Sequence, residues 1–336
     1  MDSLTQLALG AAVSVAAMGR RTAVWKAVLV GAVVGTLPDL DVLIDHGDPV
    51  ANMVLHRAES HALLWLTLAT PLLAALVAGA LREWGAWRRW CGAVGLALIT
   101  HPLLDALTVY GTQLLLPFTN QPYGLGSVFI VDPLVTLPLL IGTGVALARR
   151  DPASALRANA WGFGLAVAYL AWGALAQQHV RGVAERSLAA QGVPADRILV
   201  TPAPLQTLLW RVVVVSGDRY LEGFHSLLDE TSTVQFDRFD RGLALAEPLR
   251  GHPPLVAIER FSQGFYKLTR EGDTVVVHDL RMGQEPAYVF AFGVGRGSAT
   301  IAPLSPPTAV GGRGDAGAAL RWLWPRMWGE PLPPPR

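Results

Sequence analysis

His101 and Asp105 stand one helical turn apart in the largely apolar stretch THPLLDALTVYG, residues 100–111. In a helix, residues i and i+4 project from the same face, so both side chains would meet the same neighbours. An imidazole and a carboxylate on one face could both bind a single divalent ion. The spacing therefore indicates a metal site and predicts that further ligands lie close to it.

Other ionisable side chains occur at the ends of neighbouring apolar runs. Carboxylates follow a helix-ending Pro38 in GTLPDLDVLIDH, two histidines frame HRAESH, and a further Asp stands near the start of the run that begins at residue 127. Charged groups in hydrocarbon are costly, so they usually face a bundle interior and have partners there. The candidate metal ligands are His56, His61, His101, Asp105, Asp39, Asp41 and Asp132. Histidines and carboxylates at one depth form a ligand set that Zn²⁺ or another borderline divalent ion accepts.

Ordinary structural explanations exist for several of these residues taken singly. Asp39 could be a turn residue after Pro38, and His101 could be a hydrogen-bonded core histidine. HRAESH alone could be a surface loop. Unrelated structural roles would not place all these groups on the same side of the membrane that the composition predicts below. The metal interpretation is therefore preferred.

The composition is that of a membrane protein. The chain has 336 residues, of which 51% are hydrophobic and only 16% are charged. Six apolar runs lie roughly at 4–19, 24–37, 62–81, 90–109, 127–148 and 158–176. The first two are short and could cross a bilayer only in part. The runs predict an α-helical polytopic membrane domain of about five or six helices.

Basic residues predict the orientation of this domain. Those between the apolar runs gather in alternate connections and comprise Arg20, Arg21, Lys26, Arg82, Arg88, Arg89, Arg149, Arg150 and Arg157. The other connections, 38–61 and 110–126, hold only Arg57. The positive-inside rule then places the polar loops and the chain after residue 177 outside the cytoplasm. A net charge of +1 without basic clusters argues against a nucleic-acid partner, and the single Cys91 excludes a disulfide framework.

The chain changes character after the last apolar run. We expect a membrane-embedded metal-site domain over 1–178, a connector over 179–194, a small antiparallel β-rich soluble domain over 195–300 and a Gly- and Pro-rich tail over 301–336. Strand-like runs at 254–268, 274–280 and 287–294 belong to the β-rich domain. The tail carries three tryptophans that could dock on the sheet or rest at a membrane interface.

The N-terminal motifs resemble those of the YdjM-like, membrane-bound metal-dependent hydrolases. The resemblance rests on the motifs MDSLTQLALGAAV, GTLPDLDVL, HRAESHALL, THPLLDALTVYGTQLLLPF and DPLVTLPLL. The resemblance implies a multi-helix membrane domain, distantly grouped with zinc-dependent phospholipase C and P1 nuclease, in which the seven candidate ligands bind metal. The chain departs from the family at Gln6, where many members have His, and at Ala58 and Glu59. Gln6 is then a contact of a ligand or of the substrate.

The resemblance favours a metal-dependent hydrolase with an outward-facing centre in a bacterial inner membrane. His56, His61, His101 and Asp105 are the first candidates for ligands of a divalent ion, with zinc expected. Asp39 and Asp41 are further ligands or the base that accepts a proton from water, and Arg57 anchors an anionic group such as phosphate. The depth of the site suits a membrane lipid or a lipid-linked phosphoester.

Two other functions remain open. The first is a non-catalytic metal-binding scaffold or sensor whose exterior domain recruits a protein partner that the sequence does not identify. The second is a transporter, which is disfavoured because no charged residues continue a path through the inner halves of the runs.

Overall fold

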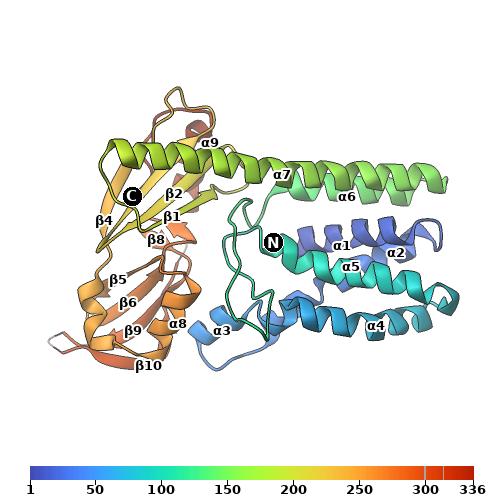
Figure 1. Cartoon of the computed structure of the whole chain (residues 1–336), viewed down its shortest axis with the longest axis horizontal. Helices are drawn as coiled ribbons and strands as arrows, with labels where there is room; N and C mark the ends of the chain where they lie inside the picture. Colours follow the sequence, from blue (N-terminus) through green and yellow to red (C-terminus); the bar gives the residue numbers. More distant parts are fainter. Residues whose placement is uncertain (299, 313) are drawn as a thin grey trace. The chain divides into compact units, whose positions relative to one another are not determined.

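The computed structural model describes residues 1–298, 300–312 and 314–336, which form two compact units (Figure 1). The first unit is helical and comprises Met1–Ile44, Arg57–Ala174 and Pro204–Gln206. The second unit is β-rich and comprises Asp45–His56, Leu175–Ala203 and Thr207–Arg336.

The helical unit is built from helices with short connections. Its α-helices are α1 (Ser3–Met18), α2 (Val24–Thr36), α4 (Leu63–Ala80), α5 (Trp87–Asp105), α6 (Pro133–Ala148) and the first part of α7 (Pro152–Ala190). Short 3-10 turns lie at η1 (Pro38–Leu43), η2 (Glu59–His61) and η3 (Trp84–Ala86). Carboxylates begin two of the helices: Asp2 accepts hydrogen bonds from the first N–H groups of α1, and Asp132 caps α6.

Helix α1 forms the centre of this unit and packs on α2, α5 and α6. The crossing with α2 depends on glycine, because a Cβ on Gly31 would lie 2.2 Å from the carbonyl oxygen of Gly10. Gly142 and Gly162 bring α6 and α7 together in the same way. These close approaches help to bury eleven of the sixteen residues of α1.

The prediction of five or six membrane-spanning helices is wrong. In the described part of the chain only α4, with 18 residues, is both long and apolar enough to cross a membrane. Helices α1, α2 and α6 are apolar but have 16, 13 and 16 residues, against about 20 for a hydrocarbon core. Helix α5 begins with two arginines among its first three residues and ends with the site residues, and α7 mixes polar and aromatic residues into its apolar part. Most of the apolar runs therefore do not form a helix that is both long and apolar enough to span.

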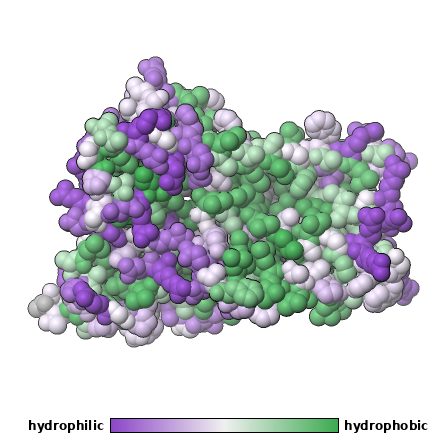
Figure 2. Space-filling view, viewed as in Figure 1, coloured by the Kyte–Doolittle hydropathy of each residue, from purple (hydrophilic) through white to green (hydrophobic). Residues whose placement is uncertain are grey.

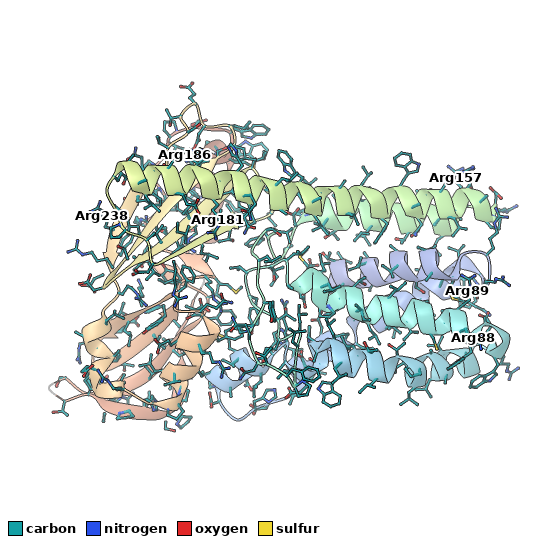
Figure 3. All side chains as sticks on the ribbon, in the orientation of Figure 1. Arg88, Arg89, Arg157, Arg181, Arg186 and Arg238 are labelled. Carbon is teal, nitrogen blue, oxygen red and sulfur yellow. The ribbon has the colours of Figure 1, made fainter. Side chains whose placement is uncertain are left out.

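The surface of the helical unit is nevertheless largely apolar on the face shown in Figure 2. Side chains that are more than half exposed include Leu29 on α2, Leu72 on α4, Ile141 on α6 and Trp161 on α7. Figure 3 shows Arg88, Arg89 and Arg157 at one end of the unit. An apolar surface of this extent marks a contact with membrane or protein.

The β-rich unit confirms the predicted antiparallel architecture. One sheet has the order β1 (Arg197–Pro202), β2 (Leu209–Ser216), β3 (Arg219–Ser226) and β4 (Phe236–Asp240). The other has the order β10 (Ala302–Ala309), β9 (Ala291–Arg296), β6 (Thr274–Asp279) and β5 (Tyr266–Glu271). A short ladder joins β7 (Gly283–Gln284) to β8 (Ala287–Tyr288). All the paired strands are antiparallel.

Helices flank these sheets within the same unit. They are α3 (Pro49–Leu55), α8 (Pro253–Phe261), α9 (Ala316–Met327) and the later part of α7, with 3-10 turns η4 (Leu243–Leu245) and η5 (Glu247–Leu249). The first half of the strand-like run 254–268 is a helix, α8. Two prolines begin it, and Leu255, Ile258 and Phe261 bury one helical face, so the helical period prevails over the β-branched composition.

The glycine contact between α1 and α2 makes a direct prediction. Gly31→Ala should lower the unfolding temperature of the detergent-purified chain, because the added Cβ meets the backbone of Gly10 and overpacking of this kind costs about 1–3 kcal/mol. Gly144→Ala on α6 is the matched control, since a Cβ there meets nothing within 4 Å among the described residues. Equal unfolding temperatures for the two variants would contradict the packing assigned to α1.

Candidate metal centre

Four ionisable side chains of the helical unit converge on one point. Asp39 comes from η1, His61 from the end of η2, and His101 and Asp105 from the last turns of α5. One ligand atom from each lies within 4.8 Å of the corresponding atoms of the other three. We call these four residues the metal group.

The distances within the metal group match those between ligands of a single ion. The Nε2 atoms of His61 and His101 are 3.1 Å apart, and Asp105 Oδ2 lies 3.2 Å and 3.4 Å from them. Asp39 Oδ1 lies 3.7 Å from His61 Nε2 and 3.4 Å from His101 Nε2. Ligand atoms in a tetrahedron around Zn²⁺, with bonds of about 2.0–2.2 Å, are about 3.3–3.6 Å apart.

Three residues of the metal group are fully buried and the fourth is partly exposed. His61, His101 and Asp105 are at most 1% exposed, whereas the side chain of Asp39 keeps 16% of its surface. Asp105 Oδ2 is buried and accepts no hydrogen bond from the described residues. A buried carboxylate oxygen that accepts no hydrogen bond and lies close to two imidazole nitrogens is suited to bind a cation together with them.

The orientation of His101 is fixed from behind by the backbone. Its Nδ1 lies 2.6 Å from the carbonyl oxygen of Gly35 on α2. A carbonyl oxygen can only accept, so Nδ1 must carry the proton and donate it. When the ring is neutral, Nε2 therefore presents its lone pair to the metal group.

The two carboxylates of the metal group favour a positive charge between the four side chains. Burial raises the pKa of the Asp39 carboxyl, but hydrogen bonds that the His101 and His61 imidazoles donate when they are protonated lower it by more, so that its pKa lies well below the ordinary value. Asp39 is thus ionised at neutral pH. Protons on the imidazoles or a divalent ion can supply the charge that the two carboxylates of the group require.

Asp105 is held by further contacts on its other side. Gln6 of α1 donates from Nε2 to Asp105 Oδ1 at 3.0 Å and to the backbone oxygen of His101 at 3.2 Å. The α-amino group of Met1 also contacts Asp105 Oδ1. Gln6 therefore contacts Asp105, one of the four residues of the metal group.

Arg57 lies behind the group in a strained backbone conformation. Its φ is 64°, a value that residues other than glycine seldom adopt. The side chain is buried, its guanidinium lies 5.0 Å from the ring centroid of Tyr110, and Nε is 3.4 Å from Asp105 Oδ2. The structure thus directs this cation at a candidate ligand, and its role as a phosphate anchor stays a prediction.

Three of the predicted ligands lie outside the metal group. Asp41 accepts a hydrogen bond from the N–H of Arg57 at 2.9 Å, and His56 ends α3 in the other unit. Asp132 caps α6 and accepts from the hydroxyl of Tyr169 at 2.9 Å. The Asp-Pro pair at 132–133 is a common start of a helix and was the available signal for that capping role. Ser60 beside His61 was missed, because a serine within HRAESH carries no metal-ligand signal.

Comparison with known proteins bears on the same region. A model of the family described as YdjM inner membrane protein matches residues 1–180, which is more than half of the 336-residue chain and contains the whole metal group. No curated protein and no solved structure matches the chain.

Removal of a ligand should release the ion. His101→Ala or His61→Ala in the detergent-purified protein should weaken binding of Zn²⁺ at least about 100-fold, because each deletes one donor from a buried group of four. Competition with a chromophoric chelator measures the affinity. His46→Ala removes a histidine outside the group and should leave binding unchanged, as should His56→Ala. A loss in His56→Ala equal to that in His101→Ala would show that the group has been assigned wrongly.

Proposed function

The chain belongs to the YdjM inner membrane protein family, and on that premise we propose that it is a metal-dependent hydrolase of the inner membrane. The observation that carries the proposal is the unequal burial of the metal group. His61, His101 and Asp105 are enclosed, while Asp39 alone of the four keeps appreciable contact with the surface. Two histidines and one carboxylate, with a further position open to water and substrate, are the ligand pattern of catalytic zinc sites.

The three enclosed residues would hold the ion. When bound, a divalent ion would supply an activated water and a Lewis acid for the scissile bond. Zinc is the ion we expect, because a mixed set of imidazole and carboxylate donors at these separations suits it.

Asp39 is the residue that we assign as the base. Its Oδ1 lies within 3.7 Å of both imidazole Nε2 atoms, so it stands next to any atom that the other three residues bring to the centre. A carboxylate in this place accepts the proton that the attacking water loses. Its position in η1, one residue after Pro38, brings it to the partly open side of the group.

The residues beside Asp39 suit an apolar substrate. Leu40, Val42 and Leu43 of η1 are exposed, Leu43 to 79%. Large exposed apolar side chains next to Asp39 in the chain favour a substrate with hydrocarbon chains. Together with Arg57 behind Asp105, they support a membrane lipid or a lipid-linked phosphoester as the substrate.

The site is proposed to lie on the outer side of the membrane. His61 is two residues before α4, the one described helix that could span, and Arg82, Arg88 and Arg89 follow the other end of that helix. The positive-inside rule then puts the end of α4 next to the metal group outside the cytoplasm. Placement of the β-rich unit outside the cytoplasm rests on the charge pattern of the sequence alone.

A non-catalytic centre is the second candidate. All four ligand atoms lie within 4.8 Å of one another, and four protein ligands would complete a tetrahedral shell. Such a closed shell is typical of structural zinc, and the chain would then be a scaffold or a sensor. The two candidates differ in the role that they give to Asp39.

Asp39→Asn separates them. If Asp39 is the base, the variant should keep its zinc and lose about 10²- to 10⁴-fold in turnover, because binding and proton transfer depend on different groups. Wild type and variant in lipid nanodiscs should be compared for zinc content and for hydrolysis of phosphodiester and phosphomonoester lipids. Asp45→Asn, which changes an exposed carboxylate outside the group, serves as the control.

Two results would favour the closed shell instead. The first is a loss of zinc affinity in Asp39→Asn as large as that in Asp105→Asn. The second is an absence of turnover in zinc-loaded wild type with every lipid tested.

A further inference from the structure

Behind His61 runs a chain of side chains that ends in a carboxylate. His61 Nδ1 lies 2.8 Å from Ser60 Oγ, and the Ser60 hydroxyl donates to Asp41 Oδ2 at 2.6 Å. Asp41 is buried, and its Oδ2 is also 3.5 Å from His61 Nδ1. All three residues belong to the helical unit.

The chemistry of the three groups fixes the direction of the hydrogen bonds. An ionised carboxylate can only accept, so the single proton of the Ser60 hydroxyl points to Asp41. The hydroxyl oxygen is then the acceptor for His61, and Nδ1 of His61 must carry a proton. In the neutral ring this leaves Nε2 without a proton, and Nε2 is the atom that faces the metal group.

Asp41 also holds the backbone that carries these residues. Its Oδ2 accepts from the N–H of Arg57, the residue with a φ of 64°, at 2.9 Å. The segment from Arg57 to His61 is therefore attached to Asp41 at both ends, through a backbone N–H and through the Ser60 hydroxyl. Substitution of Asp41 would release both.

The two histidines of the group are thus oriented by different means. His101 donates to a backbone carbonyl, which no substitution can remove, whereas His61 depends on two side chains. A carboxylate behind a metal-binding imidazole fixes its tautomer and raises its basicity, and loss of such a partner typically costs 10- to 100-fold in affinity.

We propose that Ser60 and Asp41 are positioning residues that hold His61 in its Nδ1–H tautomer and thereby set the affinity of the metal group for its ion. The proposal rests on the metal centre of the proposed function and assigns Asp41 neither as a ligand nor as the base. It does not depend on whether the centre is catalytic.

The test is an affinity measurement on the full-length protein in detergent. Ser60→Ala should bind Zn²⁺ about 10- to 100-fold more weakly than wild type, while Ser60→Thr, which keeps the hydroxyl, should restore most of the affinity. Asp41→Asn should lose at least as much as Ser60→Ala, because an amide can donate toward Ser60 and allow the proton of His61 to move to Nε2. Ser232→Ala, at an exposed serine outside the site, is the matched control.

Cobalt absorption supplies a readout that a merely structural role would not move. In Co²⁺-loaded protein, Ser60→Ala and Asp41→Asn should shift the visible bands, and Ser60→Thr should keep the wild-type spectrum. Wild-type affinity and spectrum in both Ser60→Ala and Asp41→Asn would overturn the proposal. If Ser60→Ala does not fold, the near-isosteric Asp41→Asn decides by itself.

Failure of the proposed function gives a different result. Zinc-loaded wild type without turnover, but with the predicted losses of affinity, would refute the hydrolase and support the positioning role. Wild type that binds no divalent ion would refute the centre and the positioning role together.

Discussion

The site depends on one electrostatic constraint: two imidazoles and two carboxylates converge in a mostly buried place and need positive charge between them. Two imidazole nitrogens 3.1 Å apart, with carboxylate oxygens 3.2–3.7 Å from them, cannot stay there without positive charge between them. Neighbouring groups also stabilise the side chains of the metal group. Arg57, Gln6 and the carbonyl of Gly35 each act on a member of the group from outside. A divalent ion held by His61, His101 and Asp105 would supply this charge next to Asp39.

The helical packing brings these residues together. Helix α1 supplies Gln6 to the site and crosses α2 at Gly10 and Gly31, and α2 in turn supplies the carbonyl of Gly35 to His101. A larger residue at the crossing would push α2 away from α1 and so displace the carbonyl of Gly35. The glycines therefore bear on the metal group although they lie outside it. This link between packing and site explains how short helices can hold a precise arrangement of ligands.

The sequence predicted the part of the site that local spacing determines. The i, i+4 spacing of His101 and Asp105 indicated a shared face, and both belong to the group. The sequence could not show which of His56 and His61 belongs to the metal group, because this depends on the left-handed backbone conformation of Arg57 between them. The antiparallel sheets followed from strand-like runs such as 274–280, which forms β6. The number of membrane spans did not follow, because composition shows how apolar a run is but not where its helix begins and ends.

The central claim is that both histidines of the group bind one ion, and X-ray absorption of the zinc-loaded protein tests it most directly. The account predicts two imidazole nitrogens at about 2.0–2.1 Å, with an oxygen of Asp105 and a further oxygen ligand in the shell. His101→Ala should remove one imidazole from the signal. A shell of oxygen atoms alone, or an unchanged number of imidazoles in His101→Ala, would contradict it.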